Sequence, residues 1–184
     1  MMIPGATYIK ITHNFFVPRD KYKHADYDAD MFCLPLNAVG VIESDDEVVF
    51  FNNLSNKNKS ICLYGDCLPG CVDCGEASVG VDLSSVPDEN KTLLVLSHLY
   101  QAQEREISFC DGVSEVVITR LNQPMECHGE TIITQPLASC LHISDTIELC
   151  RLIRMGHEWK VIFPDSIRVE VSFKEYLKSF GVTF

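Results

Sequence analysis

The chain has 184 residues, 46% of them hydrophobic, and a formal net charge of −11. This length suits one domain, residues 1–184, that can bury a full core without disulfides or metals. The negative charge argues against nucleic-acid binding, because phosphate contacts supply most of the affinity in such complexes. No apolar stretch approaches the ~20 residues that span a bilayer, so we expect no direct membrane insertion.

Cysteine usage and the N-terminus predict the compartment. The chain has nine cysteines, an odd number, and Met1–Gly5 leads into a mixed strand-like run rather than a charged and then apolar secretory signal. We therefore expect a cytoplasmic protein whose thiols are reduced.

Short strands separated by turns dominate the pattern. After the N-terminal run, the expected strands are one at Met31 and Phe32, then Glu47–Phe51, Val79–Leu83, Thr92–Ser97, Glu115–Thr119, Ile147–Ile153 and Trp159–Phe163. Asn52 and Asn53 predict a turn, Gly156 a hairpin, and residues 100–106 a weaker helical or turn segment. Many short strands with turns about every ten residues predict a mainly β fold, a two-sheet β-sandwich.

One helix is well marked near the C-terminus. Ser172 is a good N-cap, and Glu175 completes a capping box three residues later. Apolar residues at helical spacing follow from Phe173 to Phe180, and Gly181 ends the helix. We expect this short helix to dock its apolar stripe on the sheet.

Two acidic segments precede expected strands. Asp26, Asp28 and Asp30 share a face if the backbone is extended, and such like charges repel unless a cation lies among them. The spacing is not that of an EF-hand, because Met31 stands where the sharp turn needs glycine. A solvated charged turn is the alternative, and it is also the favoured interpretation of Asp45–Glu47.

The loop from Leu63 to Glu76 is the richest in potential ligands. It contains three carboxylates and three cysteines, namely Asp66, Asp73, Glu76, Cys67, Cys71 and Cys74, and Cys62 stands just before it. Carboxylates suit calcium, and clustered thiolates suit zinc. Cys71 and Cys74 form one C-x-x-C pair, but Cys62 and Cys67 are too widely spaced for a second. The cysteines could also be small apolar residues, or a redox pair, although Gly75 disfavours the helix that redox pairs open.

Signals for an enzyme are absent from the sequence. There is no G-x-S-x-G, no Gly-rich phosphate loop after a strand, and no closely spaced histidine pair. We therefore expect no catalytic activity.

The order of these motifs resembles the TerD family of tellurium-resistance and stress proteins. The matching segments are Asp26-x-Asp28-x-x-Met31-Phe32, Ser44-Asp45-Asp46, Val49-Phe50-Phe51-Asn52-Asn53-Leu54, Gly65-Asp66 through Glu76, Val79-x-Val81-x-Leu83-x-x-Val86-Pro87, Tyr100-Gln101-Ala102-x-x-Arg105-x-x-Ser108-Phe109, Gly156-His157-Glu158-Trp159-Lys160 and Tyr176-Leu177-x-x-Phe180-Gly181-Val182. They run from Asp26 to Phe184, and residues 1–25 match poorly. The chain is thus similar to a divergent member of the family.

The resemblance implies a β-sandwich that holds calcium in acidic loops at one edge, with no established enzymatic activity. The implied metal ligands are Asp26, Asp28, Asp66, Asp73, Glu76 and Asn52. Asn52 and Asn53 match a paired asparagine of the family, which offers carbonyl oxygens or holds the loop. Four positions depart from the pattern, since Cys71, Gly75 and Ala77 replace acidic residues and Gln101 replaces an aspartate.

Three hypotheses about function follow. The first is a calcium-binding, non-enzymatic stress-response protein that works with other proteins of a stress-response complex. The second is a TerD-like domain with a weakened or lost calcium site that serves as a protein-interaction module, because affinity for calcium follows the number of ligand charges. The third is a zinc or thiol site formed by the cysteines between Cys62 and Cys74.

Overall fold

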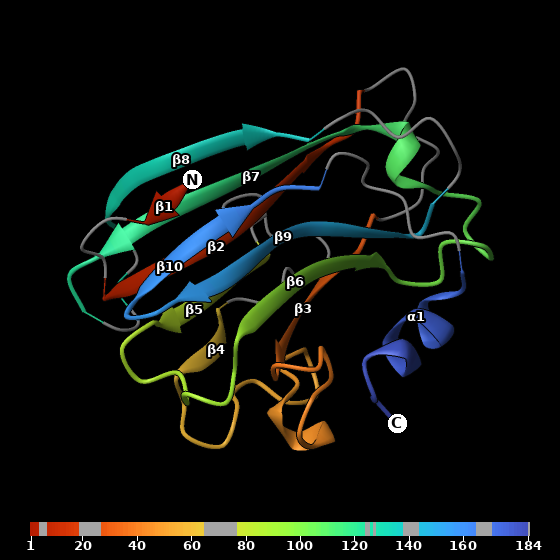
Figure 1. Ribbon diagram of the computed structural model, residues 1–184. Helices are drawn as coiled ribbons and strands as arrows, with labels where there is room; N and C mark the ends of the chain where they lie inside the picture. Colours follow the sequence, from red (N-terminus) through yellow and green to blue (C-terminus); the bar gives the residue numbers. More distant parts are fainter. Residues whose placement is uncertain are drawn as a thin grey trace.

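The computed structural model describes residues 1–3, 7–18, 27–64, 77–123, 126, 128–137, 144–164 and 171–183. These residues form two five-stranded antiparallel sheets that lie face to face, as Figure 1 shows. Sheet A has the order β1 (Met2–Ile3), β10 (Glu158–Ile162), β9 (Thr146–Met155), β6 (Thr92–Leu99) and β3 (Ala29–Leu36). Sheet B has the order β4 (Ile61–Tyr64), β5 (Ala77–Asp82), β2 (Tyr8–Phe16), β7 (Val113–Leu121) and β8 (Glu130–Pro136).

The main core fills the space between the two sheets. Alternate residues of a strand point to opposite faces, so β2 buries Ile9 and Ile11 while β5 buries Val79 and Val81. Sheet A contributes Trp159 and other inward residues to the same cluster. The predicted two-sheet β-sandwich is confirmed.

Most expected strands are present, and most of these are longer than expected. The strand-like N-terminal run is β2, the Met31–Phe32 strand is β3, and the strands expected at 79–83, 92–97 and 115–119 are β5, β6 and β7. The predicted hairpin joins β9 to β10 through a turn at Gly156, whose φ is +68°. The sequence prediction missed β1, β4 and β8, the outermost strands on three of the four sheet edges, which are short or weakly alternating.

The prediction of a strand at Glu47–Phe51 is wrong. Residues Asp45–Glu47 form a short 3-10 helix, η2, and the backbone then pairs with sheet A only at Val49, opposite Cys33. The chain turns back at once, because the amide and carbonyl of Phe50 bond to those of Asn53. The β-rich composition of this segment reflects burial of Val48 and Val49 rather than a strand.

Residues 48–55 connect the β3 edge of sheet A to the β4 edge of sheet B. Val49 pairs with Cys33 on β3, the outermost strand of sheet A, and Ser55 pairs with Cys62 on β4, the outermost strand of sheet B. The predicted turn at Asn52 and Asn53 is confirmed, and the Asn53 side chain holds it by donating to the carbonyls of Asp46 (3.0 Å) and Val48 (2.7 Å).

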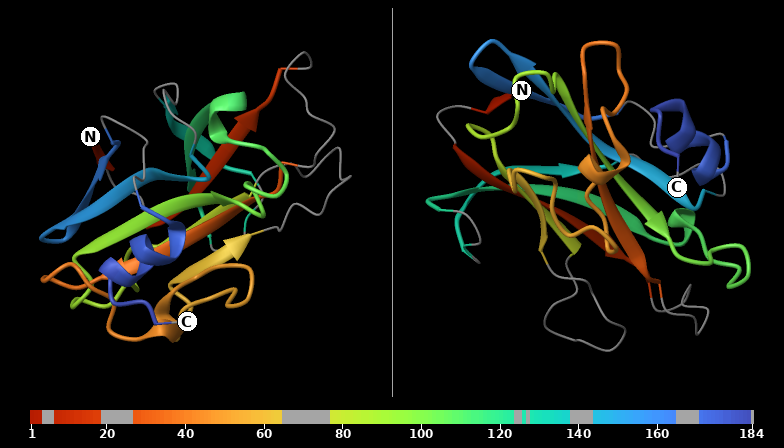
Figure 2. Two further views of the ribbon diagram at one scale, coloured as in Figure 1. Left: turned by 90° about the vertical axis from the view of Figure 1, so that its right-hand side faces the viewer. Right: turned by 90° about the horizontal axis from the view of Figure 1, so that it is seen from below.

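The predicted helix is α1, Phe173–Ser179, and both hydrogen bonds of its capping box form. Phe180 is the C-cap, and Gly181 follows with φ of +85°, a conformation that favours glycine. The helix packs against the outer face of sheet A through Leu177, as expected, and Figure 2 shows it lying across β6 and β3. Residues 100–106 form turns rather than a helix. In the described part of the chain, no helix has the length and apolarity to cross a membrane.

Candidate metal centre

Three stretches outside the described residues, 19–26, 65–76 and 138–143, are connected to the sandwich at the same end. The described positions that flank them are Pro18 and Tyr27, Tyr64 and Ala77, and Leu137 and Ser144. We call this the loop end. It carries the last residues of β2, β4 and β8 and the first residues of β3, β5 and β9.

Three of these flanking residues contact other residues of the sandwich at the loop end. Tyr27 donates from its hydroxyl to Asp111 (3.2 Å), and its ring lies edge-on to Phe15 near the end of β2, 5.8 Å away. Leu137 N donates to the carbonyl of Ser114 at 2.9 Å. Ser144 accepts at its carbonyl from Phe109 N at 3.0 Å.

A buried histidine ties the two sheets together below the loop end. His13 of β2 is opposite Ala77 of β5, and its side chain points into the core in the same register as Ile9 and Ile11. Its Nδ1 is 3.1 Å from the Ser97 hydroxyl on β6, and its Nε2 is 3.1 Å from the Ser114 hydroxyl on β7. A neutral imidazole donates through one nitrogen and accepts at the other, so both ring nitrogens are satisfied.

Burial keeps His13 neutral. Desolvation lowers its pKa from 6.5 to about 3, because the charged form loses its hydration inside the core. The rings of Phe15 and Phe109 lie 6.2 Å and 5.7 Å from the imidazole and complete its apolar surroundings. Sequence reasoning missed this residue. Its signal was the alternating register of residues 9, 11 and 13.

Of the six predicted metal ligands, only Asp28 and Asn52 belong to the described residues. Asp28 is half-buried immediately before β3, and its carbonyl accepts from Tyr100 N at 2.9 Å. Asn52 is exposed in the turn beside β3. The other four, Asp26, Asp66, Asp73 and Glu76, lie outside the described residues. Within the described ranges, no three histidine, cysteine or acidic side chains gather as a metal site would require.

The acidic segment Asp45–Glu47 has structural contacts. Asp45 accepts from the backbone N–H (2.9 Å) and the hydroxyl of Thr183, which ties the C-terminal segment to η2. Asp46 pairs with Lys57 at 3.0 Å and accepts from the Ser44 hydroxyl. These carboxylates stabilise η2 and its contact with the C-terminal segment, and the strand that was expected to follow this acidic turn is not formed.

The described cysteines are Cys33, Cys62, Cys110 and Cys150, of which Cys33, Cys62 and Cys150 are free thiols. Burial raises the pKa of Cys33 to about 12 and also raises the pKa of Cys150. The pKa of Cys62 is raised chiefly by partial burial as well. Raised values disfavour the thiolate that both zinc binding and nucleophilic reactivity need. The remaining cysteines of the predicted soft site, Cys67, Cys71 and Cys74, lie outside the described residues.

Comparison with known proteins decides the family. The TerD domain profile matches residues 4–163. The chain belongs to the TerD domain family. The match begins well before Asp26, so the first 25 residues fit the family better than the motifs indicated, and it ends before α1.

Two curated relatives illustrate the range of TerD-family proteins. General stress protein 16U of Bacillus subtilis is 29% identical over 135 residues, which cover 73% of this chain and 68% of the relative. Tellurium resistance protein TerD of Serratia marcescens is 30% identical over 84 residues, 46% of this chain. This second match spans less than half of the relative, 44% of its length.

A solved structure shares the fold. The crystal structure of a TerD homologue from Streptomyces coelicolor A3(2) superposes with a TM-score of 0.66 over 94% of this chain and 96% of that chain, at 12% identity. At this identity the likeness concerns the β-sandwich alone.

Proposed function

We propose that this TerD-family chain is a calcium-binding, non-enzymatic protein of the stress response, and that it acts in the cytoplasm with other proteins of a stress-response complex. The names of its relatives, general stress protein and tellurium resistance protein, support the biological role. The calcium would be held by Asp26, Asp28, Asp66, Asp73, Glu76 and Asn52.

One observation carries the calcium proposal, namely the common attachment of the predicted acids at the loop end. Asp26 is bonded directly to Tyr27, Glu76 directly to Ala77, and Asp66 follows Tyr64 by two residues. Each of these three acids is therefore joined, within two residues along the chain, to a described residue of the loop end. Carboxylates from separate strands that meet at one end of a sandwich are suited to a hard cation with oxygen ligands.

Calorimetry and thermal unfolding with calcium test the proposal. On chelated protein, calcium should release or absorb heat and raise the melting temperature, because a ligand of the native state adds about 2.7 kcal/mol of stability at one hundred times its Kd. Asp66→Asn and Asp73→Asn should each weaken binding at least about tenfold. Glu89→Gln is the matched control, since Glu89 is exposed just before β6, at the end of that strand away from the loop end.

Absence of both heat and thermal shift at millimolar calcium would contradict the proposal. Elemental analysis of the protein before and after chelation separates the alternatives, because a stoichiometric zinc would instead support the cysteine site. If the Asp66 and Asp73 variants bind calcium as tightly as the unsubstituted protein, other residues hold the ion.

One described residue favours the second hypothesis, a protein-interaction module with a weakened calcium site. Ala77, which replaces an acidic residue of the family pattern, is half-buried on β5 and packs against the main core. A core-facing alanine supplies no ligand, so the charge available to a cation is smaller. If this candidate is right, strong chelation should leave the melting temperature unchanged, and the chelated protein should still capture a defined partner in a pulldown.

A further inference from the structure

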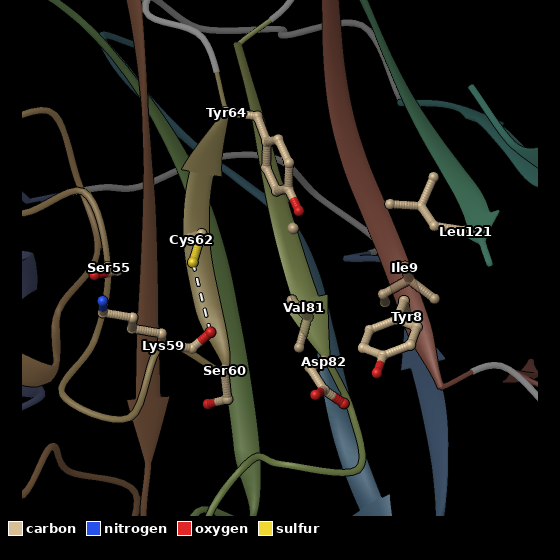
Figure 3. Close-up of a pocket in the computed structure, with 11 residues that line it drawn as sticks. Tyr8, Ile9, Ser55, Lys59, Ser60, Cys62, Tyr64, Val81, Asp82 and Leu121 are labelled. Carbon is tan, nitrogen blue, oxygen red and sulfur yellow. Dashed lines mark hydrogen bonds between the residues drawn. The ribbon is translucent and has the colours of Figure 1, made fainter. Parts of the chain in front are cut away.

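The outer face of sheet B contains a pocket of about 390 Å³ that lies over β4, β5 and β2 (Figure 3). Its lining includes Tyr8, Cys62, Tyr64, Asp82 and Leu121, which come from four adjacent strands. None of these is a predicted calcium ligand. The described helix α1 packs on the other sheet and does not cover this face.

Glycine at position 80 makes the pocket possible. The ring of Tyr64 reaches from β4 across β5, and a Cβ at Gly80 would lie 1.7 Å from the Tyr64 Cε2 atom. Any other residue at Gly80 would therefore displace the ring. The aromatic side chain lies against bare backbone, and the space beside it stays open.

Two aromatic rings and one carboxylate surround this space. Tyr8 projects from β2 on the same face as Tyr64 (Figure 3). Asp82, at the end of β5, is oriented by donors from the following turn: Oδ1 accepts from the Ser84 N–H (3.1 Å) and hydroxyl (2.7 Å), and Oδ2 accepts from the Ser85 hydroxyl (2.7 Å). The carboxylate is thus held in position before any ligand arrives.

These groups favour a cation over an anion or a neutral ligand. Aromatic faces carry a negative quadrupole that attracts ammonium groups, and a fixed carboxylate adds direct charge attraction. The net charge of −11 raises the local concentration of small cations. Lys59 is the basic residue of the lining, and Figure 3 shows its ammonium group extending toward Ser55 at the rim, away from Tyr8.

We propose that this pocket binds the alkylammonium group of a small organic cation, with Tyr8 and Tyr64 against the alkyl surface and Asp82 as counter-ion. The proposal does not depend on the proposed calcium centre, because the lining includes none of the predicted calcium ligands. The expected ligands are quaternary or primary ammonium ions that are small enough for the pocket.

The test is an NMR titration of isotope-labelled protein with choline, in excess calcium chelator and at constant ionic strength. The amide signals of Gly80 and its neighbours should shift and saturate, whereas 3,3-dimethylbutan-1-ol, the neutral isostere of choline, should bind at least about fivefold more weakly. Saturation without any difference between the two probes would show an apolar pocket and overturn the proposal. No shift at millimolar choline would overturn it as well.

Two variants of opposite charge test the sign of the ligand. Asp82→Asn should weaken choline binding about fivefold, and Lys59→Gln should strengthen it, because each changes one charge at the same pocket. The reverse pair of effects would indicate an anion and contradict the proposal. Because Lys59 is exposed, Lys59→Gln should fold normally. The effect of charge can therefore be measured even if Asp82→Asn does not fold.

Tyr64→Leu should also weaken binding, and Tyr100→Leu is the matched control. Tyr100 is an exposed tyrosine outside the pocket, with the Arg105 guanidinium 5.3 Å from its ring centroid. Equal loss in both variants would show that the effect of Tyr64 is not local. The thermal unfolding of each variant confirms that binding is compared between folded proteins.

Discussion

The outer faces of the two sheets differ sharply in chemistry. On sheet A, Phe32, Leu34, Leu94 and Leu96 point outward and are buried beneath α1. On sheet B, the outward residues of β2, β4 and β5 are mostly polar or amphipathic, namely Tyr8, Lys10, Thr12, Cys62, Tyr64, Ser78 and Asp82.

This difference explains where α1, the single α-helix among the described residues, docks. β6 is apolar on both faces, so one face joins the main core and the other must be covered by another element. β5 alternates between apolar and small or polar residues, so its outer face needs no helix to cover it and accommodates a pocket. Covering a face therefore follows from the residues that point outward rather than from the strand order.

The largest loss of stability is expected from a substitution on the outer face of sheet A, which α1 covers. Leu96→Ala should lower the free energy of unfolding by about 3 kcal/mol, because it removes a fully buried side chain from the cluster beneath α1. Val117→Ala on the outer face of sheet B should cost less than about 1 kcal/mol, because Val117 is only half-buried. Urea unfolding of both variants measures the contrast. Equal losses would show that the two outer faces are equally packed.

An intermediate effect on stability is expected from His13, whose hydrogen bonds join the two sheets. His13 has a folded pKa of about 3 and an ordinary value of 6.5, so below pH 6.5 the unfolded chain gains a proton that the folded chain does not. Stability should thus fall as the pH drops from 6.5 toward 3, by about 2 kcal/mol at pH 5 from this residue. Denaturant unfolding at pH 7 and pH 5 measures the change.

His13→Gln is the variant that isolates this contribution. Glutamine keeps a donor and an acceptor for Ser97 and Ser114 but does not titrate, so the loss between pH 7 and pH 5 should shrink by about 2 kcal/mol. The remaining pH dependence includes His98, whose pKa burial also lowers, against the opposing charge of Asp145. An unchanged loss in His13→Gln would exclude His13 as its source.

The smallest effect concerns the helix that covers sheet A. Ser172→Ala removes the N-cap hydroxyl that accepts from the third backbone N–H of α1, and should cost about 1 kcal/mol. Lys174→Ala, at an exposed position of the same helix, should change stability by less than about 0.5 kcal/mol. Thermal unfolding distinguishes the two. A matching loss in Lys174→Ala would show that the loss in Ser172→Ala is not specific to the N-cap hydroxyl.

The candidate site was predictable only in part. The Asp26–Asp30 spacing and the acidic loop were visible as sequence motifs, and the flanks of both lie at the loop end. The family resemblance left two roles open for the paired asparagines, and the structure shows that Asn53 holds the turn through the carbonyls of Asp46 and Val48, which only folding brings near. The alkylammonium pocket left no motif either, because Tyr8, Tyr64 and Asp82 are far apart along the chain.

Local sequence patterns were enough to predict the fold class, most strands and α1, because alternation, turn residues and a capping box act over a few neighbouring positions. It also carried the motif order that identifies the TerD family. Tertiary structure alone decided that Glu47–Phe51 is not a strand, since pairing at one residue and the turn at Asn53 override local β propensity. It likewise decided that His13 joins the two sheets and that Gly80 makes room for Tyr64, because both depend on contacts between strands distant in sequence.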